Sequence, residues 1–330
     1  MRLSGKSSCE LPEDVQTALL QARDSEQKQS IAYHILDLIL ENIKAAKERQ
    51  YPICQDTGLP VFYINYPSGI STSGITECIR KSGGDRNRTG ISCAQCSGCP
   101  DRCQQREQSG KKIPYLSFTE WERPEIEVTC LLKGGGSENV SIQYSLPDTK
   151  LFAGRDFAGA AACIVDAVIR AQGKGCAPGI IGVGIGGDRI SGMQTAKEQL
   201  LRRLDDKNAN AELNKMEKNL YSMLNKLGIG PMGLGGKSTV LGVKIGTARQ
   251  DPGFLFCFRF LYVLGLPESG PALPALKYTG EESSERREYE KKTHRFAPQQ
   301  FGDTRNAYRR GTAAFGKDHH GEGPCTPLDA

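Results

Sequence analysis

Apolar side chains recur near the 3.6-residue helical period in two parts of the chain, residues 11–50 and residues 155–172. In the first part the apolar stripe consists of Leu36, Ile39, Leu40, Ile43 and Ala46. We therefore predict helices in both parts. Residues 192–203, which follow a glycine-rich turn, are predicted to form another helix.

Between these helices, short apolar runs bounded by Gly and Pro predict strands. The runs lie in YPICQDTGLPVFYINYP, in IEVTCLL at 126–132, in GIIGVGIGGDR and in the stretch that follows LGIGPMGLGGKST. Strands that alternate with helices favour a mixed α/β (α+β) domain. We expect this domain to span residues 1–252, with the helices of 11–50 at its N-terminus.

Two segments break the pattern. Residues 82–112 have almost no apolar period and carry four cysteines within CAQCSGCPDRC, so we treat them as an aberrant loop. From about residue 253 the sequence shows neither the helical nor the strand period, and residues 253–330 are predicted to be a disordered tail.

Composition narrows the class of protein. The net charge of +5 is spread along the 330 residues without interleaved aromatic and basic side chains, so no nucleic-acid partner is expected. No apolar run approaches the roughly 18 residues of a membrane span, and the first residues lack the apolar core of a signal peptide. Twelve cysteines without a secretion signal favour a reducing, cytoplasmic location and metal or thiolate chemistry.

The glycine loops admit several interpretations. GVGIGG, from Gly182 to Gly187, fits a dinucleotide fingerprint with Asp205 as the ribose-binding acid, but the strand before it is very short. GLGGKST fails as a phosphate loop because the first required glycine is Pro231. The glycines could simply form turns. Alternatively, they bring backbone N–H groups next to side chains that would cradle a dicarboxylate, namely Lys133, Arg189 and Lys237.

The cysteines also divide into groups. Cys54 and Cys176 lie in glycine-rich polar loops, which favours ligation, whereas Cys130 and Cys163 fit buried packing positions. The loop cysteines have the C-x2-C-x2-C-x3-C spacing of a ferredoxin cluster, which would make the protein an electron carrier. These four residues are Cys93, Cys96, Cys99 and Cys103. A zinc knuckle or a disordered loop are the other interpretations.

Several long motifs occur in a characteristic order: ICQDTG, IPYLSFTEW, KGGGSEN with QYSLPD, QGKGCAPGI, GVGIGGDR, AKEQLLRRL and LGIGPMGLGGKST. Together they resemble the N-terminal, alpha-type part of the class I fumarase and L-tartrate dehydratase family. The resemblance covers residues 10–80 and 113–252. Members of that family are hydro-lyases in which three cysteines hold a [4Fe–4S] cluster and one iron stays open to substrate.

Carried over to this sequence, the resemblance implies that Cys54 and Cys176 are cluster ligands. It makes Gln55 a substrate contact and Asp56 an acid–base residue that works with a threonine of the C-terminal domain. The remaining implied pocket residues are Lys133, Gly135, Gly136, Ser137, Arg189 and Lys237. The expected substrate is a C4 dicarboxylate, converted from fumarate to malate, as in the tricarboxylic acid cycle, or from tartrate to oxaloacetate. The C-terminal or beta-type domain is the expected partner, in a homodimer.

The third ligand of the family is missing. Where the family has a stretch like PASFFVSVSYMCWASRRA, this chain has PGFLFCFRFLYVLGLPESGPA, in which Cys257 comes too early. Read one base later, the codons from Phe254 to Ser269 permit SFFVSVSYMCWASRRA, with its cysteine near the Val263–Leu264 junction. We therefore predict that the reading frame slips near residue 253.

The same shift accounts for the cysteine loop. AQCSGCPDRCQQRE, read one base later, permits PNAVDALTGANSGN, a loop that the family carries between its CQDTG and IPY motifs. At the other end, FGKDHHGEGPCTPLDA permits SGKIITARDRAHR, which resembles the start of the family's C-terminal domain. We predict that residues 82–112 and those after 253 are out of frame and that the chain as written is inactive.

Overall fold

The structure is a computed structural model that describes residues 7–56, 58–88, 97–98, 103–104, 113–248, 254–260 and 267–268. The chain divides into two compact units, residues 1–274 and 275–330, and every described residue lies in the first unit. The domain boundary predicted at residue 252 stays a prediction, and residues 275–330 lie outside the described residues.

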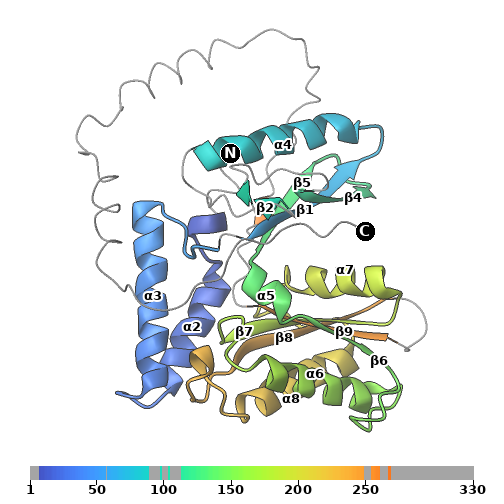
Figure 1. Ribbon diagram of the computed structural model, residues 1–330. Coiled ribbons are helices and arrows are strands. Elements are labelled where there is room, and N and C mark those ends of the chain that lie inside the picture. The colour runs from blue at the N-terminus through green and yellow to red at the C-terminus, as the bar shows by residue number, and fades with distance from the viewer. Residues whose placement is uncertain are drawn as a thin grey trace, which may run out of the picture. The chain divides into compact units, whose positions relative to one another are not determined.

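Two helices open the fold, α2 (Glu13–Ser25) and α3 (Ile31–Arg49), and lie side by side in Figure 1. Helix α3 begins after Ser30, whose hydroxyl accepts a hydrogen bond from the Tyr33 N–H at 3.1 Å. It ends at Arg49, and the residue that follows, Gln50, has a left-handed backbone conformation. The predicted apolar stripe is confirmed, since the residues that α3 buries are Ala32, Leu36, Ile43 and Ala46.

The first sheet has the strand order β10 (Pro267–Glu268), β5 (Glu127–Lys133), β1 (Leu59–Pro67) and β4 (Tyr115–Trp121). Strand β1 runs parallel to β4 and antiparallel to β5. Leu59 at the start of β1 therefore pairs with Lys133 at the end of β5. Helix α4 (Thr72–Arg88) packs on the same core through Ile75 and Ile79. This register brings the loop before β1 next to the loop after β5.

The second sheet has the order β6 (Ile142–Ser145), β9 (Phe254–Phe260), β7 (Gly179–Ile185) and β8 (Val240–Thr247). Helices α6 (Phe157–Ala171) and α8 (Ala211–Asn225) cover one face of this sheet, and α7 (Arg189–Gln199) covers the other (Figure 1). The structure thus confirms a mixed α/β fold with N-terminal helices. A third, two-stranded sheet of the described residues pairs β2 (Ser97–Gly98) with β3 (Cys103–Gln104).

Two glycines let α7 lie directly on β7. A Cβ atom at Gly182 would lie 2.4 Å from the Ala196 carbonyl oxygen, and one at Gly184 would lie 2.3 Å from the Gly192 carbonyl oxygen. Asp205 forms a salt bridge with Arg203 at 2.8 Å. Close helix–strand packing therefore explains the spacing of GVGIGG without a bound dinucleotide.

Strand β9 lies inside the segment that we expected to lack regular structure. It is antiparallel to both of its neighbours, with Cys257 opposite Ile142 of β6 and Val183 of β7. The sequence FLFCFRF is rich in the aromatic residues that favour strands. The predicted loss of structure thus does not begin at residue 253, and the tail other than 254–260 and 267–268 lies outside the described residues.

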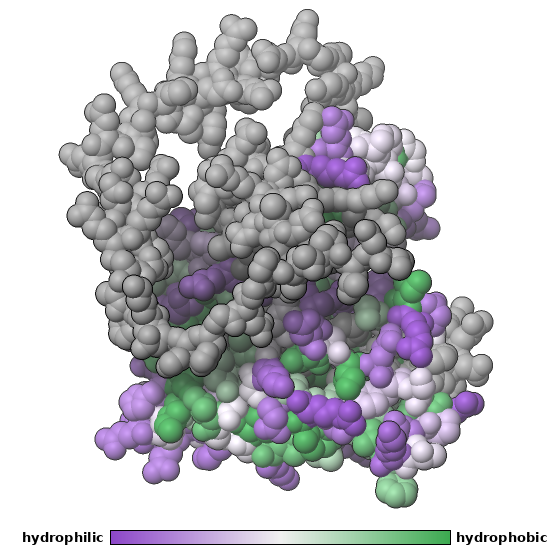
Figure 2. Space-filling model, in the orientation of Figure 1, coloured by the Kyte–Doolittle hydropathy of each residue, from purple (hydrophilic) through white to green (hydrophobic). Residues whose placement is uncertain are grey.

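No helix among the described residues is long and apolar enough to cross a bilayer. On the coloured part of the face shown in Figure 2, green hydrophobic residues alternate with purple hydrophilic ones over the helices of the second sheet.

Candidate active site

The loop that carries Cys54 is fixed through the residue before it. Ile53 is buried in the core of the first sheet. Its N–H donates to the Ser8 carbonyl at 2.9 Å, and its carbonyl accepts a hydrogen bond from the Asn42 side chain at 2.9 Å. Cys54 itself is exposed. Both backbone polar groups of Ile53 are therefore satisfied, so the exposed thiol follows a well-anchored peptide.

Asp56 is held by two backbone N–H groups from different segments. Its Oδ1 accepts a hydrogen bond from Gly58 at 3.1 Å, within its own loop. Its Oδ2 accepts one from Gly135 at 2.6 Å, across 79 residues of sequence. Hydrogen bonds to an ionised carboxylate are among the stronger ones in proteins, so this pair orients the Asp56 carboxylate at the start of β1.

Gly135 begins α5 (Gly135–Asn139), a helix of five residues without a side-chain N-cap. So short a helix is not stable by itself, and its glycines raise the entropic cost of ordering it. It is anchored through Ser137, whose hydroxyl donates to the Gly134 carbonyl at 2.9 Å and accepts from Lys133 at 3.0 Å. Tertiary contacts therefore hold the amide that binds Asp56.

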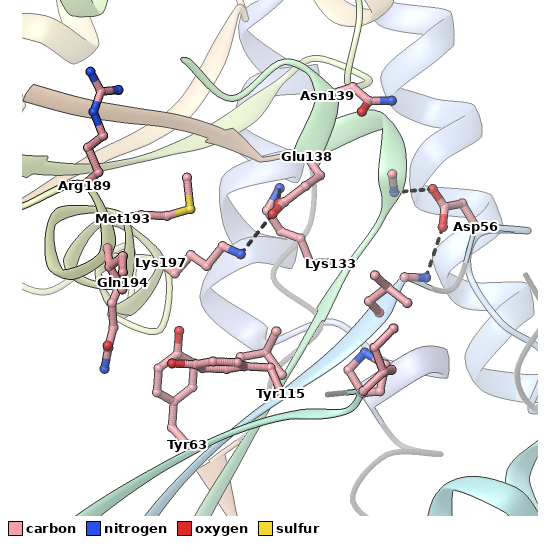
Figure 3. A pocket seen from close by; sticks show the side chains of 17 residues that line it. Asp56, Tyr63, Tyr115, Lys133, Glu138, Asn139, Arg189, Met193, Gln194 and Lys197 are labelled. Atoms are coloured by element: carbon pink, nitrogen blue, oxygen red, sulfur yellow. Dashed lines mark hydrogen bonds and ion pairs between the residues drawn. The ribbon is translucent and has the colours of Figure 1, made fainter. Parts of the chain in front are cut away.

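Asp56, Lys133 and Gly135 line a pocket of about 740 Å³ (Figure 3). Strands β1, β4 and β5, α5 and α7 contribute its walls. The apolar part of the lining comes from Leu59, Pro60, Val61, Ile113, Ile190 and Met193, next to the rings of Tyr63 and Tyr115. The polar part comes from Asp56, Lys133, Glu138, Asn139, Arg189, Gln194 and Lys197.

Glu138 bridges two lysines inside this pocket. Its Oε2 lies 2.7 Å from the Lys133 ammonium, and its Oε1 lies 2.9 Å from the Lys197 ammonium. Figure 3 shows Glu138 between the lysines, with Asp56 on one side in this view and Arg189 on the other. The bridge joins the end of β5 to α7, the helix that packs on the second sheet.

Burial dominates the titration of Lys133. Its side chain is only 3% exposed, and this desolvation lowers its pKa to about 8, although Glu138 favours the charged form. Lys197 lowers the same pKa further because it brings a second positive charge. Burial works to raise the pKa of Glu138, but Lys133 and Lys197 together hold that pKa below its usual value.

The other residues that we predicted as substrate contacts lie in different places. Arg189 lines the pocket, and its guanidinium donates to the Gln143 side chain at 3.0 Å. Gly136 is an exposed residue of α5, and Gln55 is exposed beside Asp56. Their roles as substrate contacts stay predictions. Glu138 and Lys197 were missed, although both lie within the conspicuous motifs KGGGSEN and AKEQLLRRL.

Lys237 lies at the end of α2 and is not among the residues that line this pocket. Its ammonium donates to the Ser25 carbonyl at 3.1 Å. The backbone N–H groups of Lys237 and Ser238 both donate to Glu26, at 2.7 and 2.9 Å. The GGK turn therefore does bind a carboxylate, but that carboxylate belongs to the chain itself.

The loop of Cys176 packs against α5. A Cβ atom at Gly175 would lie 2.8 Å from the Val140 side chain and 3.6 Å from the Gly136 carbonyl oxygen. Cys176 has a left-handed backbone, with φ of +59°, which is uncommon outside glycine and often marks a functional position. Burial raises the pKa of its thiol, and negative charge on Cys54 and Asp56 raises it further. The two predicted thiols and Asp56 are thus electrostatic neighbours.

The assignment of Cys54 and Cys176 as cluster ligands stays a prediction. Thiols on glycine loops are the soft ligands that iron–sulfur clusters take. Within the described ranges, however, no group of three His, Cys, Asp or Glu residues is arranged to hold a metal ion.

The loop cysteines give no further help. Cys93, Cys96 and Cys99 lie outside the described residues, and Cys103 belongs to β3. The ferredoxin interpretation therefore stays a prediction. The backbone of β9 places Cys257 opposite Val183, four residues beyond Gly179 at the start of β7. At about 3.3 Å per residue, Val183 lies roughly 13 Å along β7 from Gly179, the end of the strand that follows Cys176.

Sequence comparison decides the family. The profile of the fumarate hydratase (Fumerase) family matches residues 1–257, which is most of the chain. The chain belongs to this family. The match ends close to residue 253, the point at which we expect the reading frame to slip.

Relatives of this fumarate hydratase family member extend the comparison. A Geobacillus stearothermophilus protein assigned as a fumarate hydratase class I is 42% identical over 84% of this chain and 56% of its own length. A Methanocaldococcus jannaschii protein assigned as an L(+)-tartrate dehydratase subunit alpha is 34% identical over 71% of this chain and 82% of its own. The Escherichia coli K12 L(+)-tartrate dehydratase subunit alpha is 25% identical over 74% and 80%. The chain thus spans little more than half of the Geobacillus relative.

Proposed function

We propose that this chain is the alpha-type part of an iron–sulfur hydro-lyase that adds water to a C4 dicarboxylate or removes it. The candidate reactions are fumarate to malate and tartrate to oxaloacetate. Fumarate and tartrate are the substrates named for the relatives. The observation that carries the proposal is the placement of Asp56. Its carboxylate is held by the Gly58 and Gly135 amides at the wall of a pocket that also contains Lys133.

The charges of the pocket suit a dianion. Lys133, Arg189 and Lys197 bring three positive groups, against the carboxylates of Asp56 and Glu138. Glu138 is already neutralised by two lysines, so the surplus positive charge is available to a substrate carboxylate. The apolar part of the pocket lining lowers the local polarity, which strengthens such an ion pair.

Asp56 is the proposed acid–base residue. Hydration across a C=C bond requires one group that gives or takes a proton at carbon while hydroxide adds at the neighbouring carbon. The amides of Gly58 and Gly135 fix the orientation of both Asp56 carboxylate oxygens at the wall of the pocket. The partner acid or base would come from the C-terminal domain.

Cys54 and Cys176 would hold the cluster, since they are neighbours on loops that pack on α5. When bound, the cluster would supply a Lewis-acidic iron for the substrate hydroxyl and carboxylate. Asp56 would lie beside it, between the thiols and the cationic part of the pocket. Gln55, exposed on the same loop, is the proposed contact that orients the substrate.

The register of β9 supports the position that we predict for the third cluster ligand. Phe260, the last residue of β9, lies opposite Ile180 of β7. If this antiparallel register continued for three more residues, position 263 would lie opposite Ala177, the residue directly after Cys176. A cysteine near the Val263–Leu264 junction, which the shifted reading frame supplies, would therefore come to the same end of the sheet as Cys176. Cys257 would not.

The proposed partner is a C-terminal or beta-type domain, in a homodimer. That domain would close the open side of the pocket and bring the second acid–base group. The named alpha subunits among the relatives support a two-part enzyme. Neither Cys54 nor Cys176 forms a disulfide, which fits our assignment to the reducing cytoplasm.

The test is to restore the reading frame and assay both proteins. We expect the restored protein, purified without oxygen, to bind about one cluster per chain and to turn over fumarate or tartrate, whereas the 330-residue chain does neither. Cys54→Ser and Cys176→Ser in the restored protein should each lose iron and turnover, because thiolate is the preferred ligand.

Cys78→Ser is the matched control, since Cys78 is also exposed but lies on α4. It should keep both iron and activity. Full iron content in either ligand variant would disprove the assignment. Iron that instead depends on Cys93 in the 330-residue chain would favour the ferredoxin interpretation.

A further inference from the structure

Lys133 is unusually buried for a residue that would bind a substrate. Its side chain is 3% exposed, yet it lines a pocket of about 740 Å³. It donates to Ser137 at 3.0 Å and lies 2.7 Å from Glu138, and a second lysine, Lys197, contacts the other oxygen of the same carboxylate. A point charge that only attracts a dianion does not need such burial.

We propose that Lys133 is a carbonyl-reactive amine that forms an imine with a small oxo-dicarboxylate in this pocket. The proposal does not depend on the hydro-lyase reaction, on the cluster or on Asp56 as an acid–base group. It rests on the constellation of a buried amine, a carboxylate that can move its proton and a second cation. Such constellations are how proteins make a lysine nucleophilic.

The surroundings of Lys133 favour the neutral amine. Three charged groups face it: Glu138 on α5, Lys197 on α7 and Asp56 on the loop before β1. Desolvation outweighs the two carboxylates, and the pKa of about 8 leaves a sizeable neutral fraction near neutral pH. Relative to an exposed lysine, with a pKa near 10.4, the neutral fraction is raised by roughly two orders of magnitude.

The pocket selects the ligand class. Lys197 and Arg189, both on α7, line the same pocket as Lys133 and give it the positive charge that attracts a carboxylate ligand. The apolar part of the lining includes Met193 and the exposed Ile190, so a small oxo acid can enter the pocket from solvent. A four-carbon oxo acid with two carboxylates, such as oxaloacetate, matches this arrangement of charges.

The step balances without any external reagent. The Lys133 ammonium gives one proton to Glu138, and the amine lone pair attacks the carbonyl carbon to form the C–N bond. The C=O electron pair moves to oxygen, which takes a proton from Glu138 and another from the nitrogen as it leaves as water. Lys133 ammonium and a carbonyl compound thus yield a protonated imine and one water molecule.

A β-carboxylate would then be labile. The protonated imine accepts the electron pair of the breaking C–C bond, so CO₂ leaves and an enamine remains. The enamine carbon takes a proton, and one water hydrolyses the resulting imine to the shorter oxo acid and the Lys133 ammonium. The further activity that we infer is therefore slow decarboxylation of a β-oxo dicarboxylate.

The experiment uses the 330-residue chain without iron. The chain is incubated with oxaloacetate and sodium cyanoborohydride at about pH 7.5, and the reduced adducts are located by peptide mass spectrometry. We expect Lys133 to be labelled at least about tenfold faster than the exposed Lys150 and Lys215, given its larger neutral fraction. Equal labelling of these lysines, or no label on Lys133, would overturn the proposal.

Two variants control for folding and for the site. Lys133→Arg keeps a positive charge at the position and should abolish the fast label and the release of CO₂. Glu138→Gln removes the proton acceptor and should slow labelling of Lys133 while the circular dichroism spectrum stays native. The labelling assay uses chain without iron and does not measure hydration, so the imine proposal and the hydro-lyase proposal can fail separately.

Discussion

Gly58 lies in backbone contact with Lys133. A Cβ atom at Gly58 would lie 2.5 Å from the Lys133 carbonyl carbon and 2.7 Å from its nitrogen, and φ at Gly58 is +77°. No other residue fits there without moving the backbone. This contact sets the distance between the Asp56 loop and the end of β5, and thus allows the Gly135 amide to reach Asp56.

Gly58→Ala should therefore be strongly destabilising. The left-handed backbone costs about 1 kcal/mol for alanine, and the overlap with Lys133 adds about 1–3 kcal/mol. Gly69→Ala is the matched control, since Gly69 has φ of +81° and nothing within 4 Å of its Cβ position. Urea unfolding should show a larger loss for Gly58→Ala. Equal losses would mean that the close approach is not rigid.

Asp56→Asn should separate chemistry from structure. Asparagine keeps an oxygen for one of the two amides, so we expect a folded protein with its cluster. Turnover of the frame-restored protein should fall about a hundredfold or more, the scale of a general acid–base group. Asp156→Asn is the comparison, because Asp156 caps α6 through Gly159 at 2.7 Å. It should change neither stability nor turnover appreciably, because asparagine caps a helix about as well as aspartate.

The helices and strands that sequence predicted best are those with a long apolar period or a continuous apolar run. Residues 155–172 became α6, and residues 126–132 became β5 with a shift of one residue. Residues 192–203 became α7, which begins earlier, at Arg189, because Asp188 caps it. Helix α8 was overlooked because polar residues dominate AELNKMEKNLYSMLN, although Leu213, Leu220 and Leu224 are buried.

The candidate site was predictable only in part. ICQDTG and KGGGSEN were identified as site motifs, and the structure brings Asp56 and Gly135 together. The bridge of Lys133, Glu138 and Lys197 was not predicted, because contacts between β5 and α7 depend on how the two sheets pack. Lys237 stays a predicted substrate contact, but it does not line this pocket, because its backbone N–H binds Glu26, which is 211 residues away in sequence.

Glu217 is a buried carboxylate that should matter for stability alone. It accepts hydrogen bonds from Arg202 at 2.9 Å, from Asn208 at 2.8 Å and from the Ile245 N–H at 2.8 Å. Glu217→Gln replaces the charged acceptor and should cost about 1.5–3 kcal/mol in urea unfolding. Glu212→Gln, exposed on the same helix, should cost much less. No loss for Glu217→Gln would show that Arg202 is satisfied by Asp206 alone.

The last prediction concerns the pH dependence that Lys133 imposes on stability. Its pKa is about 8 in the folded chain against an ordinary value of 10.5, so between these pH values the unfolded chain binds more protons than the folded one. The free energy of unfolding should therefore rise with pH from about 8 upward, because the cost of burying the ammonium disappears as it loses its proton.

Lys133→Met should lack this rise, since methionine has no proton to lose. The quantity to measure is the difference in the free energy of urea unfolding between the parent chain and Lys133→Met. This difference should be constant below pH 8 and should grow in favour of the parent between pH 8 and about 9.5. The full gain up to pH 10.5 would be on the order of 3 kcal/mol, since one pKa unit corresponds to about 1.4 kcal/mol. Taking the difference cancels the titration of other groups. Lys150→Met is the control with an exposed lysine and should follow the parent. A difference that stays constant over this range would mean that Lys133 keeps its ordinary pKa, and the raised reactivity of its amine would then lose its physical basis.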